Sequence, residues 1–216
     1  MNNLEAVLFD LDGTLIDSEY YYYCCWSPVL KRNFDLDFSY QDWLQNFAGH
    51  TDEKNFSILR ERYHAPVEVS VLRKEIEASY ADRPMTSIPL MPYAKEILAL
   101  LKDKHIKIGL VTSSRRHVAD LILGHHDLLS YFDFFMTKDL VENTKPHPEP
   151  YLMAIDNLHL PKESIVAIED TAIGYASATA AGLECYIITT QDFQLQMLPD
   201  AAKKLPSLAD FAKELV

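Results

Sequence analysis

The sequence predicts an α/β fold, in which a parallel sheet carries helices on both faces and one helical segment interrupts the pattern. Two observations lead to this prediction. Short apolar runs alternate with segments of helical periodicity along most of the chain, and one long stretch near the N-terminus contains helical patterns only. Strands that alternate strictly with helices pair in parallel, because each helix returns the chain to the edge where the next strand begins.

Five strands are expected, each a short apolar run bounded by polar or turn residues. They cover residues 5–9, 106–111, 132–136, 164–168 and 184–188. The helices between them cover residues 91–104, 117–123, 148–158 and 172–181. Pro92 is placed in the first turn of its helix, where a proline is well tolerated, and Gly182 ends the last one.

The stretch from residue 16 to about residue 88 breaks the alternation. It contains three helical patterns, at residues 20–31, 52–63 and 67–80, and Pro84 and Pro89 precede the return to the sheet. We therefore expect a Rossmann-like core made of residues 1–16 and 89–216. Residues 17–88 are expected to form a small helical domain inserted after the first strand.

Composition limits the possible partners and the location. No stretch of about 18 uncharged apolar residues is present, so no membrane span is expected. The N-terminus lacks a basic region followed by an apolar run, and the cytoplasm is the expected location. A net charge of −12 argues against nucleic acid as a partner. A small anionic metabolite stays possible, because a bound cation can invert the potential of one pocket. Oligomeric state is left open, with a monomer expected.

The three cysteines, two of them adjacent, form a poor disulfide framework. They also lack the spacing of a zinc site, which needs about four ligands. We expect small buried hydrophobic side chains at these positions.

Polar residues follow the expected strands at their carboxyl ends. Asp10, Thr112 and the pair Glu169-Asp170 come directly after three strands, and Lys145 lies just beyond another. Because the carboxyl ends of parallel strands meet at one crevice where ligands bind, these side chains are expected to lie together.

The segment DLDGTL, residues 10–15, suits phosphoryl transfer. A bare pair of aspartates two residues apart could equally be a solvated turn, but this pair ends a buried strand. One carboxylate, Asp10, can attack a phosphoryl group, and the other, Asp12, can protonate the leaving oxygen and then activate water. Such chemistry also needs a hard cation, which Asp170 and Glu169 can bind, and a fixed positive charge, which Lys145 supplies.

Four motifs in this order resemble the haloacid dehalogenase superfamily of phosphotransferases. They are DLDGTL at 10–15, LVTSS at 110–114, TKPHPEPY at 144–151 and AIEDTAIGYASATAAG at 167–182. The resemblance covers essentially the whole chain, and the helical insertion looks like the cap domain of that superfamily. The pattern is closest to the subgroup that holds β-phosphoglucomutase and phosphoglycolate phosphatase.

The resemblance implies a role for each matching residue. Asp10 is the implied nucleophile and Asp12 the general acid and base, while Thr112, Ser113 and Lys145 hold the phosphoryl group. Mg²⁺ is the implied cofactor, bound by the Asp10 carboxylate, the Asp12 backbone carbonyl and Asp170. Glu169 is either a direct ligand or an outer acceptor. The carboxylate at Asp12 disfavours carbon–halogen cleavage, because the true dehalogenases lack it.

Accessory residues keep two interpretations each. Ser113 and Ser114 either cap the following helix or contact the ligand. Arg115 either contacts the substrate or is a solvated arginine at the start of a helix.

The segment SEYYYYCCW, residues 18–26, is interpreted as the first cap helix, which we expect to be covered nearly all round. Tyr22 is either core or a substrate contact, and it stands where the mutase has a histidine. Asp52 aligns with a phosphate-binding arginine of the mutase. Both differences favour a Mg²⁺-dependent phosphatase acting on a small phosphate monoester. The alternatives are a phosphosugar mutase and a catalytically idle binding or regulatory member.

Overall fold

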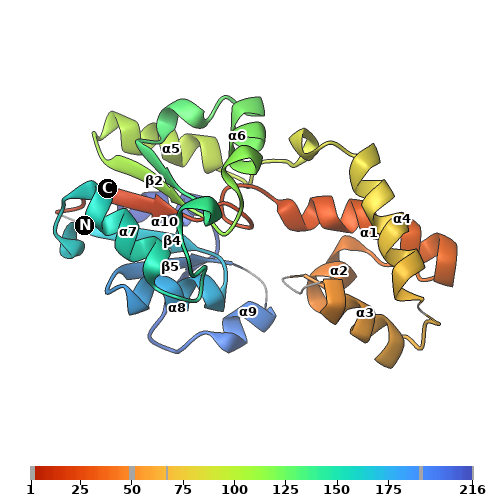
Figure 1. Cartoon of the computed structure of the whole chain (residues 1–216). Helices are drawn as coiled ribbons and strands as arrows, with labels where there is room; N and C mark the ends of the chain where they lie inside the picture. The colour runs from red at the N-terminus through yellow and green to blue at the C-terminus, as the bar shows by residue number, and fades with distance from the viewer. Residues whose placement is uncertain (1–2, 49–51, 67, 190–191, 216) are drawn as a thin grey trace. The chain divides into compact units, whose positions relative to one another are not determined.

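The computed structural model describes residues 3–48, 52–66, 68–189 and 192–215. The chain divides into two compact units (Figure 1). The sheet unit consists of Met1–Asp17 and Leu90–Val216, and the helical unit of Ser18–Pro89.

A six-stranded sheet forms the centre of the sheet unit, and all its neighbouring strands pair in parallel. The strands are β1 (Ala6–Phe9), β2 (Lys107–Val111), β3 (Phe134–Met136), β4 (Ile165–Glu169), β5 (Glu184–Ile188) and β6 (Lys203–Leu205), in the spatial order β3-β2-β1-β4-β5-β6. The α/β prediction is confirmed. Strand β6 was not predicted, because this three-residue edge strand, Lys-Lys-Leu, contains no apolar run.

The strand order places a topological switch point beside β1. This strand pairs with β2 on one side and with β4 on the other, so that Phe9 lies opposite both Leu110 and Ile168. All four β1 residues are buried, which explains why the strand reads as an uninterrupted apolar run. In open parallel sheets, ligands bind at the carboxyl ends of the strands that flank such a point.

Helices cover both faces of this sheet (Figure 1). They are α5 (Ala94–Asp103), α6 (Arg116–His125), α7 (Glu149–Leu158), α8 (Ala172–Ala180), α9 (Asp192–Met197) and α10 (Leu208–Glu214). On one face, α7 and α8 pack on Leu8 and Ala167 in a single apolar cluster. On the other, Phe211 of α10 lies 5.2 Å, centroid to centroid, from the ring of Tyr186 in β5.

Two details of these helices differ from the sequence analysis. Pro92 lies outside its helix, because Tyr93 adopts a left-handed backbone (φ 70°) as the N-cap residue and α5 starts only at Ala94. The structure also contains α9 and α10, which were not expected. They have six and seven residues, too few to show a clear apolar period.

The helical unit contains α1 (Ser18–Phe34), α2 (Tyr40–Asn46), α3 (Asp52–Glu61) and α4 (Val69–Asp82), followed by the 3₁₀ turn η1 (Met85–Ser87). Helix α2 was not predicted, because seven residues are too few to show a clear helical period. Ser39 and Asp42 form a capping box at its start. Aromatic rings fill the centre of the unit. The indole of Trp26 lies 5.8 Å from that of Trp43 and 5.5 Å from the ring of Phe56.

The tyrosine-rich segment lies in α1, but the expectation that this helix is covered nearly all round is wrong. Tyr21 and Cys25 are buried on the side that packs on α4, whereas Tyr20 and Tyr22 are 42% and 39% exposed. One helix can bury only the stripe that faces its neighbours. The exposed tyrosines instead contact other rings, as Tyr20 does with Tyr40 at 5.2 Å.

No helix among the described residues is long and apolar enough to cross a membrane. All three cysteines are free thiols; Cys25 and Cys185 are buried and Cys24 is half-buried.

Candidate active site

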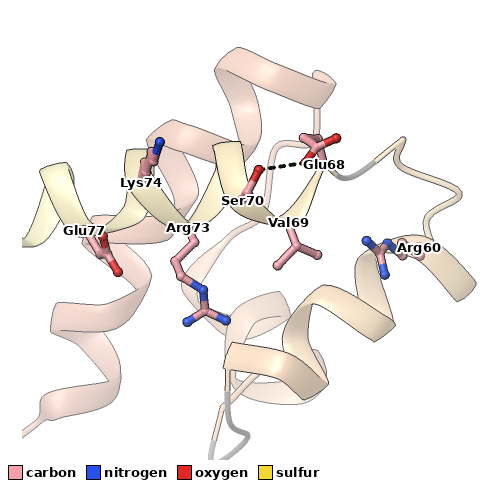
Figure 2. Close-up of a pocket in the computed structure, with 7 residues that line it drawn as sticks. All are labelled: Arg60, Glu68, Val69, Ser70, Arg73, Lys74 and Glu77. Carbon is pink, nitrogen blue, oxygen red and sulfur yellow. Dashed lines mark hydrogen bonds between the residues drawn. The ribbon is translucent and has the colours of Figure 1, made fainter.

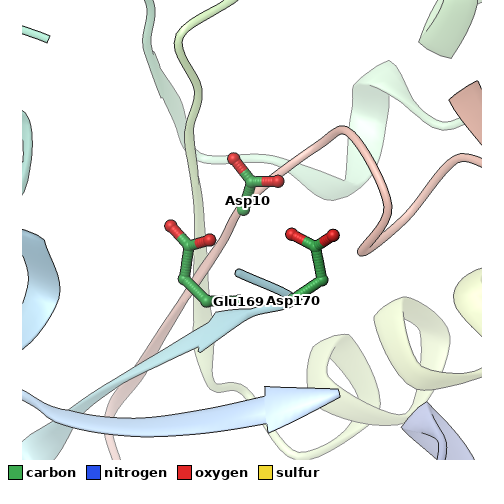
Figure 3. A group of neighbouring side chains, drawn as sticks. All are labelled: Asp10, Glu169 and Asp170. Atoms are coloured by element: carbon green, nitrogen blue, oxygen red, sulfur yellow. The ribbon is translucent and has the colours of Figure 1, made fainter. Parts of the chain in front are cut away.

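Three carboxylates meet at the switch point of the sheet (Figure 3). Asp10 directly follows β1, Glu169 is the last residue of β4, and Asp170 comes next. Because β1 and β4 are neighbours in register, their carboxyl ends bring these side chains together. Each contributes an oxygen that lies within 4.8 Å of the other two.

Lys145 supplies the positive charge at this cluster. Its ammonium donates to Asp10 Oδ1 at 2.6 Å, to Glu169 Oε1 at 2.5 Å and to the Val111 carbonyl at 2.7 Å. Burial acts to lower the pKa of Lys145, but the carboxylates of Asp10 and Glu169 outweigh it and hold the pKa above its usual value. All three ammonium protons therefore have acceptors within the protein.

Tyr151, which the sequence analysis did not single out, supports the cluster from α7. Its hydroxyl is buried and donates to Glu169 Oε1 at 2.6 Å, and its ring lies 5.3 Å from the Lys145 ammonium. Burial raises the pKa of Tyr151 well above its usual value, which keeps the hydroxyl protonated as a donor. The only signal in the sequence was its place in the TKPHPEPY motif.

Burial also shifts the pKa of Glu169, the last residue of β4, and of Asp170, which follows it. It raises the pKa of Glu169 to about 7, against the opposing effect of Lys145. Burial, together with repulsion by Asp10 and Glu169, raises the pKa of Asp170 well above its usual value. Both shifts arise first from burial, and the repulsion among the carboxylates adds to it.

Two glycines leave room for these carboxylates. Gly13 has a left-handed backbone (φ 80°), and a Cβ there would collide with the Asp170 carboxylate. A Cβ at Gly174, in the first turn of α8, would collide with the carboxylate of Glu169. The glycines of the motifs DLDGTL and EDTAIG thus allow the carboxylates to lie against the backbone.

Asp12 is tied to the loop that follows β2. Its Oδ2 accepts a hydrogen bond from Ser114 Oγ at 2.8 Å, and the Ser114 amide donates to Thr112 Oγ1 at 3.0 Å. The suggestion that Ser113 or Ser114 caps the next helix is wrong. Arg115 is the N-cap residue of α6 and its own side chain makes no capping bond, while Asp139 Oδ2 accepts from the Arg116 amide at 2.7 Å. Ser113 and Arg115 are exposed, so neither is held in one position by packing.

The donor set fits a hard divalent cation. Asp10, Glu169 and Asp170 offer carboxylate oxygens, the atoms that such ions prefer, and three acidic groups face one ammonium. The crowded charge provides the physical reason for a cation at this edge.

The two cap residues that the sequence analysis singled out, Tyr22 and Asp52, line one pocket of the helical unit. A second hollow of the same unit is lined by acidic and basic side chains together (Figure 2). Its lining consists of Arg60, Glu68, Val69, Ser70, Arg73, Lys74 and Glu77. Ser70 donates to Glu68 within it at 2.7 Å. Its mixed charges indicate no particular ligand.

Comparisons with known proteins agree with this geometry. The family model of the haloacid dehalogenase-like hydrolases matches residues 7–188. A phosphorylated carbohydrates phosphatase of Thermotoga maritima is 30% identical, over 84% of this chain and 83% of its own length. Hexitol phosphatase B of Escherichia coli is 28% identical, over 98% and 96%. The crystal structure of a HAD family hydrolase from Deinococcus radiodurans, with bound phosphate and sodium, superposes with a TM-score of 0.82. It is 25% identical, over 99% of this chain and 95% of that one.

Proposed function

The chain belongs to the haloacid dehalogenase-like hydrolases, and from this premise we propose that it is a Mg²⁺-dependent phosphatase of small phosphorylated sugars that works through an aspartyl-phosphate. One observation carries the proposal most strongly. The Asp10 carboxylate is held by Lys145 at the end of the central strand, next to a further pair of carboxylates suited to a cation. The names of the two phosphatase relatives support a phosphorylated carbohydrate as the substrate class.

In the first half of the proposed reaction, the Asp10 carboxylate attacks phosphorus and the bond from phosphorus to the ester oxygen breaks. Asp12, in its protonated form, gives its proton to the leaving oxygen, so the organic product departs as an alcohol. The bond from Ser114 orients the Asp12 carboxyl group for this step. Asp10, Asp170 and the Asp12 carbonyl would hold the Mg²⁺, which would neutralise negative charge on the phosphoryl oxygens.

In the second half, Asp12 is a carboxylate and takes a proton from water. That water attacks phosphorus, the bond from phosphorus to the Asp10 oxygen breaks, and inorganic phosphate leaves. Lys145 stabilises the Asp10 carboxylate that is set free, since its ammonium lies 2.6 Å from Oδ1. Thr112 and Ser113, at the end of β2, are the proposed hydroxyl donors to the phosphoryl oxygens.

The three free cysteines support a reducing compartment, and we place the enzyme in the cytoplasm.

The test is release of inorganic phosphate from p-nitrophenyl phosphate and from sugar monophosphates, with Mg²⁺ and with excess chelator. We expect hydrolysis that needs Mg²⁺ and is lost in Asp10→Asn, which keeps the shape of the side chain but removes the nucleophile. Phosphate release that persists undiminished in chelator would contradict the proposal.

A further inference from the structure

Lys145 lies in a loop that contains neither helix nor strand. The loop covers residues 141–148, between the 3₁₀ turn η3 (Lys138–Leu140) and α7. The Lys145 side chain is 5% exposed, and its ammonium is bound to two of the three carboxylates of the site. A lysine has a flexible stem and loses much conformational entropy when it is held in one position. Contacts that fix the backbone on each side of Lys145 therefore help to set where its ammonium lies.

Glu149, the first residue of α7, binds the part of the loop that leads into Lys145. Its Oε1 accepts from the Glu142 amide at 2.7 Å. Its Oε2 accepts from the Asn143 backbone amide at 3.0 Å and from the Asn143 side-chain amide at 2.9 Å. The Asn143 side chain and the Glu142 amide hold the pKa of Glu149 below its usual range, so these are charge-assisted hydrogen bonds. One carboxylate thus closes residues 142–149 into a ring.

A glutamate in the first turn of a helix often serves the helix itself, because the positive end of the helix dipole attracts it. Glu149 differs in that its three donors all belong to the loop, and two of them are consecutive backbone amides. A carboxylate that binds donors through both oxygens adds geometric specificity as well as energy. Glu149 therefore fixes the path of the loop in addition to favouring the start of α7.

Ser177 of α8 binds the part of the loop that leaves Lys145. It has no exposed surface, and its hydroxyl donates to the His147 carbonyl at 2.6 Å. A serine in the middle of a helix commonly bonds to a carbonyl of its own helix, and it is a weaker helix former than alanine. Here the acceptor lies 30 residues away in the sequence, so the hydroxyl joins two separate segments.

The two anchored points bracket Lys145. Asn143 lies two residues before it and His147 two residues after it. Between them, the His147 amide donates to the Thr144 carbonyl at 3.0 Å, which closes a turn that includes the lysine. The anchoring side chains belong to α7 and α8, which pack in the same apolar cluster on the sheet. The loop is therefore tied to the packed core on both sides of Lys145.

We propose that Glu149 and Ser177 are positioning residues, which set the place of the Lys145 ammonium by fixing the backbone on each side of it. Both act through the loop rather than on the substrate. The kinetic consequence rests on the proposed phosphatase function, in which Lys145 stabilises the Asp10 carboxylate. The place of Lys145 itself can be measured without turnover.

Reductive methylation with formaldehyde and cyanoborohydride measures how accessible Lys145 is in the full-length protein with Mg²⁺ and without substrate. Peptide mass spectrometry gives the labelling rate of each lysine. We expect slow labelling of Lys145 in wild type, because its side chain is buried, and several-fold faster labelling in Glu149→Gln and in Ser177→Ala. Cys185, buried in β5, should stay protected from iodoacetamide in both variants, since its alkylation would show a general loosening of the sheet unit.

Two matched controls make the same chemical changes nearby. Glu142→Gln removes an equal charge from an exposed side chain of the same loop. Thr179→Ala removes a hydroxyl of α8 that donates to a carbonyl of its own helix at 2.7 Å. Both controls should label Lys145 at the wild-type rate.

Turnover of p-nitrophenyl phosphate gives the kinetic readout. In Glu149→Gln and in Ser177→Ala, kcat should fall by roughly tenfold, because misplacement of a catalytic group by about 1 Å can cost about 100-fold in rate. The change in KM should be smaller, and both controls should keep the wild-type kcat.

Each outcome separates this inference from the proposed function. If Lys145 labels at the wild-type rate in either test variant, or if Cys185 is alkylated along with it, the positioning role of that residue is overturned. A wild-type kcat in a test variant would overturn it as well, while the phosphatase stands. If Lys145 labels faster with Cys185 protected, but wild type hydrolyses no phosphate ester, then the phosphatase proposal fails and the positioning of Lys145 remains.

Discussion

Tyr151→Phe removes the buried hydroxyl that donates to Glu169, and it changes little else in the site. Phenylalanine keeps the ring that lies 5.3 Å from the Lys145 ammonium, so packing and the cation–π contact persist. The variant loses the 2.6 Å bond to Glu169 Oε1. Glu169 then keeps only the ammonium as a donor to that oxygen.

The size of the effect follows from the type of bond. A hydrogen bond to a charged group contributes about 1.5–3 kcal/mol. For a chain of this length, each kcal/mol of lost stability lowers Tm by about 2–4 °C. The Tm of the variant should therefore lie about 3–12 °C below that of wild type. Because Glu169 also anchors Lys145, and Lys145 anchors Asp10, kcat should fall as well, with a smaller change in KM.

Thermal unfolding followed by circular dichroism measures the first effect, and p-nitrophenyl phosphate turnover the second. Tyr93→Phe is the matched control, since this tyrosine is 39% exposed and its loss should shift Tm by no more than about 2 °C. The reasoning is refuted if Tyr151→Phe matches this control in both Tm and kcat.

The remaining predictions concern the same carboxylates. Asp170→Ala should weaken Mg²⁺ binding, measured by calorimetry, more than Glu169→Ala, because Oε1 of Glu169 is already bound to Lys145 and Tyr151; equal losses would contradict this ranking. Gly174→Ala should lower Tm, because the added Cβ collides with the Glu169 carboxylate and overpacking costs about 1–3 kcal/mol. This cost outweighs the helix propensity of alanine, which exceeds that of glycine by about 1 kcal/mol. A raised Tm would show that the carboxylate moves aside easily. Burial raises the pKa of Glu169 from 4.5 to about 7, so in this window the folded protein without metal binds more protons than the unfolded chain, and its stability falls as pH rises. The gain in Tm on adding Mg²⁺ should therefore be larger at about pH 7.5 than at about pH 5, and equal gains at both values would argue against a cation at this cluster.

Five of the six strands, and the polar residues at their carboxyl ends, could be predicted from the sequence for a physical reason. Buried parallel strands need uninterrupted apolar runs, and the polar residue that ends each run marks the crevice, as Asp10 does after β1. The strand β6 escaped prediction, because at the edge of a sheet a short polar strand can pair without apolar residues.

Contacts between distant residues could not be predicted from local patterns. The bond from Ser114 to Asp12 joins positions 102 residues apart, and Tyr151 meets Glu169 only because α7 packs on the sheet. Likewise, Tyr22 and Asp52 were singled out separately, and only the packing of α1 and α3 brings them to one pocket. The tyrosine segment was misjudged because bulky residues can stay exposed when their rings contact one another.

Trapping of the covalent intermediate tests the central claim most directly. An acyl phosphate at Asp10 is reduced by borohydride to homoserine, which peptide mass spectrometry can locate. With a sugar phosphate and Mg²⁺, we expect this conversion at Asp10 alone, and none in Asp10→Asn or in excess chelator. Reduction at another carboxylate, or none at Asp10 while the substrate turns over, would contradict the account.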